Sequence, residues 1–166
     1  MLRRHLLVST ALVPVVLAME GCNGATPQQV AQQAVADVKL IASGLAGALP
    51  SLGAAVGISP ATVATVGGIV SRIQSVADGV GQAASNLDAQ PLIRQLEQLL
   101  NAAVAALAGL ALPPPFGPAL TAATVLLPVI ESLVGLALPA TAAAVMPSQA
   151  QINDARLVLA GAAQGK

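Results

Sequence analysis

The sequence contains very few charged and aromatic residues. Only 8% of its 166 residues are Asp, Glu, Lys or Arg, whereas about a quarter of a typical soluble domain is charged. It has no tryptophan, no tyrosine and one phenylalanine, Phe116. Nucleic-acid binding needs a basic surface, and often aromatic side chains on which bases stack. Since both are missing, we expect no nucleic-acid partner.

Histidine and cysteine each occur once, as His5 and Cys22. A single cysteine cannot form an internal disulfide. The absence of histidine after residue 5 excludes Ser-His and Cys-His catalysis there, and also histidine-dependent zinc or iron sites. The carboxylates do not follow EF-hand spacing, and no glycine-rich phosphate loop is present. We therefore expect no enzyme, catalytic residue, metal, cofactor or small-molecule substrate.

Residues 1–21 have the layout of an export signal. Arg3 and Arg4 form a basic start, residues 6–18 are a short apolar run, and Gly21-Cys22 follows. This order is typical of a secretory signal, because the apolar run is too short for a spanning helix. The sequence thus predicts that the rest of the chain is exported.

Residues 19–22, Met-Glu-Gly-Cys, resemble the lipobox of bacterial lipoproteins, although Glu20 stands where a small residue is usual. The resemblance implies that Cys22 is lipidated and tethers the protein to the periplasmic face of a membrane. The alternative is ordinary signal cleavage, which would leave a soluble periplasmic protein. The string at 3–7, Arg-Arg-His-Leu-Leu, also resembles a twin-arginine signal.

The chain as a whole resembles uncharacterised small exported helical proteins of alphaproteobacteria and their prophages. The resemblance rests on the Arg-Arg signal, on Thr-Pro-Gln-Gln at 26–29 and on Leu-Pro-Pro-Pro at 112–115. It implies a role in the cell envelope and leaves a lysis-related role open.

After a tether at 22–25, the spacing of apolar residues predicts an all-α bundle of about five helices over 26–163, with a frayed end at 164–166. Apolar positions recur three and four residues apart, as on the buried face of an amphipathic helix. The expected helices are residues 26–49, 60–84, 92–112, 119–138 and 149–162.

Prolines and capping residues set the expected helix boundaries. Pro50 should stop the first helix, and turns near 113–118 and Pro139 should reverse the chain. Ser59 and Asp88 should be the N-caps of the second and third helices, because short oxygen-bearing side chains accept hydrogen bonds from free amides there. The pairs Thr26 with Gln29 and Ser148 with Gln151 have capping-box spacing.

Three Gly-Leu-Ala runs, at 44–46, 109–111 and 135–137, precede a proline. We interpret them as a shared way of ending a helix.

The third expected helix loses its polar face after Asn101. Residues 102–112 are all Ala, Val, Leu or Gly, so we expect this half to be buried in protein or in lipid. In a soluble bundle it would be the central element, with Leu107 in the core.

One acid has two interpretations. Glu131 lies among aliphatic residues, so it could line a pore or a helix interface as a functional acid. It also shares helical spacing with Thr121 and Thr124, which would place it at the wet edge of a soluble helix. Asp37 with Lys39 is interpreted as surface charge, worth about 0–1 kcal/mol as an exposed pair.

Two classes of function remain. The first is a non-enzymatic exported cell-envelope protein, lipid-anchored at Cys22, that self-associates or binds another envelope protein. The second is a membrane-active helical hairpin, holin-like or lysis-related, in which residues 92–112 and 119–138 enter the bilayer. A 20-residue helix is about 30 Å long and would match the hydrocarbon core.

Overall fold

The structure is a computed structural model that describes residues 27–136 and 146–165. Five helices make up most of these residues: α1 (Pro27–Gly53), α2 (Pro60–Gln82), α3 (Asn86–Ala106), α4 (Phe116–Leu133) and α6 (Gln149–Ala163). No strand occurs in the described ranges. The predicted all-α bundle is therefore confirmed.

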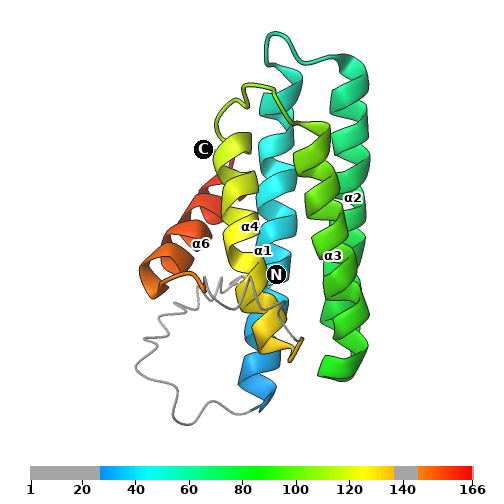
Figure 1. Cartoon of the computed structure of the whole chain (residues 1–166), viewed down its shortest axis with the longest axis vertical. Helices are drawn as coiled ribbons and strands as arrows, with labels where there is room; N and C mark the ends of the chain where they lie inside the picture. The colour runs from blue at the N-terminus through cyan, green and yellow to red at the C-terminus, as the bar shows by residue number, and fades with distance from the viewer. Residues whose placement is uncertain (1–26, 137–145, 166) are drawn as a thin grey trace, which may run out of the picture.

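Helices α1 to α4 alternate in direction, as in an up-and-down bundle (Figure 1). The connections 54–59 and 107–115 lie at one end. The short connection 83–85 lies at the other end, together with the start of α1 and the end of α4. Helix α2 packs on α1 and α3, α4 packs on α1 and α3, and α6 packs on α1 and α4.

Helix α1 is the central element: it and α4 each contact three other helices, but the contacts of α1, with α2, α4 and α6, are the more extensive. Its most buried side chains recur three or four residues apart and include Ala34, Val38, Ile41, Leu45, Ala48 and Leu52. This spacing puts them on one broad face of the helix. The expectation that the apolar half of the third helix is central was wrong. Leu107 is nevertheless in the core, with 3% of its surface exposed.

Pro50 does not stop the first helix, since α1 continues through it to Gly53. The proline has no amide hydrogen, so one helical hydrogen bond is lost near the end of the helix. The Ser51 hydroxyl donates to the Ala48 carbonyl at 2.8 Å, and Leu52, two residues after Pro50, is completely buried. Burial of the Leu52 side chain stabilises the continuation of α1 beyond Pro50.

The third helix begins at Asn86, with Ser85 as its N-cap, so the prediction of Asp88 was wrong. The Ser85 hydroxyl accepts from the Asp88 amide at 3.3 Å and donates to the Asp88 carboxylate at 2.7 Å. Asp88 is thus the third residue of α3, where a carboxylate faces the positive end of the helix dipole.

The predicted ends of the third and fourth helices were also wrong. Helix α3 ends at Ala106 and is not buried all round, because Val104 is 45% exposed. Helix α4 ends at Leu133 because Gly135 adopts a φ of +74°, which glycine tolerates. The Leu136 amide then donates to the Glu131 carbonyl at 2.9 Å and the Gly135 amide to the Ser132 carbonyl at 3.2 Å. These two bonds form a Schellman motif.

Two predicted caps are confirmed. Ser59 accepts from the Thr62 amide at 3.1 Å at the start of α2. Ser148 and Gln151 form the capping box of α6. The predicted cap at Thr26 and the corner at Pro139 lie outside the described residues.

Candidate functional site

Glu131, the predicted functional acid, lies half-buried near the end of α4. Burial raises the pKa of its carboxyl group above the ordinary value, and the negative charge of Glu97 on α3 raises it further. Thr121 and Thr124 are exposed on the same helix, and their hydroxyls donate to backbone carbonyls within α4. Glu131 therefore sits at the border between the wet edge of α4 and its contact with α3.

Glu131 and Glu97 do not amount to a metal site. Within residues 27–136 and 146–165, no group of three or more His, Cys, Asp or Glu side chains could hold an ion. The Glu131 side chain forms no hydrogen bond or ion pair with a residue of these ranges. The two acids repel each other across the α3–α4 contact, which disfavours the ionised form of Glu131.

Asp37 is buried rather than exposed, which contradicts its interpretation as surface charge. Only 2% of its surface is accessible, and it lies opposite Arg156 of α6. The Arg156 Nε donates to Asp37 Oδ1 at 2.9 Å and the Arg156 Nη2 donates to Oδ2 at 2.7 Å. Gln33 Nε2 donates to Oδ1 at 3.2 Å from one turn earlier in α1. Both carboxylate oxygens are thus occupied by donors.

This arrangement is suited to holding two helices together. A bidentate guanidinium–carboxylate pair fixes both distance and orientation. With 2% of its surface exposed and the Arg156 guanidinium against both oxygens, Asp37 is not accessible to a substrate in this structure. The pair therefore locks α6 to α1 at one position along the helix.

Two glycines bring the same helices close together. A Cβ atom at Gly44 would lie 2.7 Å from Leu159 Cδ2 and 3.0 Å from the Leu159 carbonyl oxygen. At Gly47 it would overlap the Ala162 carbonyl oxygen and lie 2.8 Å from Ala163 Cα. Small residues are needed where helix backbones approach this closely.

This contact also corrects the interpretation of the Gly-Leu-Ala runs. Gly109 and Gly135 do follow helix ends and have φ angles of +80° and +74°. Gly44 instead lies in the middle of α1, where its small size is what the contact requires.

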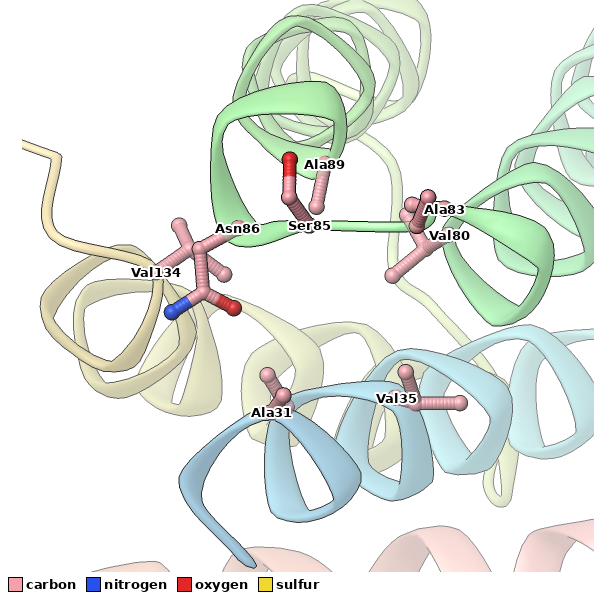
Figure 2. A pocket seen from close by; sticks show the side chains of 10 residues that line it. Ala31, Val35, Val80, Ala83, Ser85, Asn86, Ala89 and Val134 are labelled. Atoms are coloured by element: carbon pink, nitrogen blue, oxygen red, sulfur yellow. The ribbon is translucent and has the colours of Figure 1, made fainter. Parts of the chain in front are cut away.

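The cavity drawn in Figure 2 lies at the end of the bundle where α1 begins. Its volume is about 70 Å³, smaller than the roughly 300–1,000 Å³ of a typical ligand pocket. Ala31 and Val35 of α1 face the ends of α2 and α4 and the start of α3, with the Asn86 amide pointing toward α1 (Figure 2). The lining is mostly alanine and valine, so the cavity offers little to recognise a ligand.

Two larger grooves are open to solvent. One, of about 370 Å³, lies between α4 and α6 and includes Thr121, Val125, Asp154 and Val158. The other, of about 330 Å³, lies between α1 and α2 and includes Lys39 and Asp78 at its edges. No buried side-chain nitrogen or oxygen in the described part lacks a hydrogen-bond partner. Neither groove therefore contains a buried side-chain nitrogen or oxygen that lacks a hydrogen-bond partner.

The remaining predicted site residues, Arg3, Arg4 and Cys22, lie outside the described residues. Two described segments are long and apolar enough to cross a membrane: Gln28–Ala54, with a mean hydropathy of 1.3, and Phe116–Leu133, with 1.5. Core helices of soluble proteins meet the same criterion. The second segment is α4, one half of the predicted hairpin.

No protein-family model matches the chain, and neither a curated protein nor a solved structure is significantly similar to it.

The sequence reasoning missed the α1–α6 contact. One signal was available for Asp37, which lies three residues after Ala34 and four before Ile41 and so shares their face of the helix. An acid on a buried face requires a basic partner. Arg156 has the matching position, because it lies four residues after Ile152 and three before Leu159 on α6.

Proposed function

We propose that this chain is a non-enzymatic, exported protein of the cell envelope, anchored to a membrane through lipidated Cys22, whose bundle contacts other envelope components. The supporting observation is where the core begins. Every buried residue of the described core lies at or after Ala34. Cleavage before Cys22 would therefore leave all of these buried residues in the mature chain, joined to the lipidated cysteine by residues 22–26.

Intact-mass spectrometry of the protein from its native host tests the anchor. The expected species begins at Cys22 and carries the added mass of acyl chains and a diacylglyceryl group. The Cys22→Ser variant, made with an efficient substitute signal, should appear in the soluble fraction after carbonate extraction. An unmodified wild-type chain that begins before or after Cys22 would refute lipid anchoring.

A second candidate function is the membrane-active hairpin. It is favoured by the 33 uncharged residues from 98 to 130 and by the hydropathy of α4. Helix α4 has 18 residues, so it is about 27 Å long and close to the hydrocarbon thickness of about 30 Å. Retention of Cys22→Ser in carbonate-washed membranes, together with dye leakage from vesicles, would favour this function over the first.

A further inference from the structure

The contact between α3 and α4 is the least extensive of those between adjacent helices of the bundle. Helix α3 packs mainly on α2, and α4 packs mainly on α1 and α6. Among the described residues, one side-chain hydrogen bond joins the two helices, from Gln90 Nε2 of α3 to the Val134 carbonyl at the end of α4, at 3.1 Å. We call this contact the α3–α4 seam. It is the part of the bundle that is held by the least packing.

One end of the seam lies beside a packing void. The cavity of about 70 Å³ in Figure 2 is lined by Ala89 of α3 and Val134 of α4, together with residues of α1 and α2. Side chains that line a void lose dispersion contacts. At the other end, the connection 107–115 joins the two helices directly, and a Cβ atom at Gly117 would lie 3.1 Å from Leu112 Cβ. The seam is thus fixed at its connection and loosely packed at the start of α3.

Two glutamates lie on the seam, one on each helix, and both are half-buried. Glu97 follows Gln90 by two helical turns and so lies on the face of α3 that reaches α4. Glu131 precedes Val134 by three residues and lies on the face of α4 that reaches α3. The helices run in opposite directions (Figure 1), so Glu97 comes within about one turn of Glu131. The negative charge of Glu97 raises the pKa of Glu131, as this placement requires.

Among the described residues, no cation forms an ion pair with either glutamate. Arg94 lies near Glu97 on α3, but it is exposed and forms no ion pair with a described residue. The other charged residues of α3 and of the helices packed against α4 are engaged elsewhere or border other grooves, and they are Asp37, Lys39, Asp88, Asp154 and Arg156. The repulsion between Glu97 and Glu131 is therefore not offset within the seam.

Ionised Glu131 is disfavoured in the closed seam, because its carboxylate is partly removed from water and faces a like charge. A proton on Glu131 removes both costs. Separation of the helices also removes them, since both carboxylates then reach water. We propose that the α3–α4 seam is a pH-sensitive joint, closed when Glu131 is protonated and loosened at the start of α3 when Glu131 and Glu97 are both ionised. This joint does not depend on lipidation of Cys22.

The direction of the pH dependence follows from the higher proton affinity of the closed seam. The proton on Glu131 favours the closed seam fully below the ordinary pKa of 4.5, and this effect is lost as pH rises through the raised pKa. The open fraction should therefore increase with pH. The increase should be about two- to fivefold, the range expected for one like-charge pair at a partly exposed site.

The reactivity of a cysteine beside the cavity measures opening of the seam. Ala89→Cys is made in the Cys22→Ser protein, once with Glu131 and once with Glu131→Gln. Ala89 is 5% exposed and lines the cavity, which leaves room for the added sulfur. The probe is an uncharged dipyridyl disulfide, which reacts with thiols also at acid pH. Its labelling rate is proportional to the open fraction when opening is fast and transient.

The labelling rate with Glu131 is divided by the rate with Glu131→Gln at the same pH, so that thiol ionisation cancels. This ratio should be close to one below about pH 4 and about two to five above the raised pKa. A direct effect of the Glu131 charge on the thiol would lower the ratio instead, because a nearby negative charge disfavours the thiolate. Glu97→Gln should slow the labelling of Ala89→Cys over the same pH range as Glu131→Gln does.

Ala77→Cys is the matched control, because Ala77 is 3% exposed and lies at the contact between α1 and α2. Its ratio should stay at one at every pH. A ratio at Ala89→Cys that also stays at one would overturn the proposal. An equal rise at both positions would overturn it too, since the whole bundle would then be loosened rather than the seam.

Discussion

Arg156 and Asp37 are 119 residues apart in sequence, yet they form a bidentate ion pair with donor–acceptor distances of 2.7 and 2.9 Å. The arginine side chain is 24% exposed and the aspartate 2%. The two partners therefore differ in how well water can replace the pair, and this asymmetry leads to the first prediction.

Arg156→Ala should destabilise the protein more than Asp37→Ala. Loss of Arg156 leaves a buried carboxylate with only Gln33 as a donor, which should cost about 3–5 kcal/mol. Loss of Asp37 leaves a guanidinium that can reach water, at a cost of about 1–3 kcal/mol. Urea denaturation measures both, with the exposed Lys39→Ala as a control that should change stability by no more than about 0.5 kcal/mol. The reverse order would show that the pair is open to solvent.

Gly47→Ala and Gly68→Ala should have opposite effects on thermal stability. A methyl group at Gly47 would overlap the Ala162 carbonyl oxygen and force α6 away, at a cost of about 1–3 kcal/mol. At Gly68 no atom lies within 4 Å of the new Cβ, so better helix propensity should add up to about 1 kcal/mol. A harmless Gly47→Ala would mean that the α1–α6 contact is looser than described.

Leu107→Asp should unfold the bundle, while Val104→Asp should not. Leu107, the C-cap residue of α3, is 3% exposed, whereas Val104 in the last turn of the same helix is 45% exposed. Burying an unpaired carboxylate costs more than about 3 kcal/mol, a large fraction of the roughly 5–15 kcal/mol stability of a domain. Far-UV circular dichroism with urea titration measures the loss of helix. A folded Leu107→Asp protein would argue against the described core.

Glu131→Gln should stabilise the protein at neutral pH and leave it less dependent on pH. Because the pKa of Glu131 is higher in the fold than its ordinary value of 4.5, the folded state holds its proton more tightly than the unfolded state. The stability due to this proton is complete below pH 4.5 and is lost as pH rises through the raised pKa.

The test for Glu131 is chemical denaturation of both proteins across this pH range. The wild type should lose stability relative to Glu131→Gln as pH increases, and the difference should level off above the raised pKa. Glu97→Gln is the matched control, because it removes only the smaller cause of the shift and should have a weaker effect in the same direction. A constant difference between wild type and Glu131→Gln would show that the carboxyl group is unperturbed.

Local sequence signals predicted those features that depend on neighbouring residues. Ser59 and the Ser148–Gln151 box cap their helices because the side chain and the free amide are three residues apart. The apolar face of α6, with Ile152, Ala155, Leu159 and Ala162, follows from helical spacing. These features were predictable because every group involved belongs to a single helix.

Boundaries and pairings were decided by tertiary packing. Pro50 normally ends a helix, but burial of Leu52 against the bundle carries α1 one turn beyond it. The sequence around Asp37 indicates a surface charge, but the packing of α6 on α1 places Arg156 in an ion pair with it. Local propensities are worth tenths of a kcal/mol per residue, whereas burial of one leucine is worth about 1.5–3 kcal/mol.

The sequence by itself determined the helical class and the caps at Ser59 and Ser148, because these follow from residue spacing alone. Only the tertiary structure decided that α1 is central and that α6 packs closely against Gly44 and Gly47. Each of these depends on which helices lie side by side, and that is set by the total apolar surface buried among all of them.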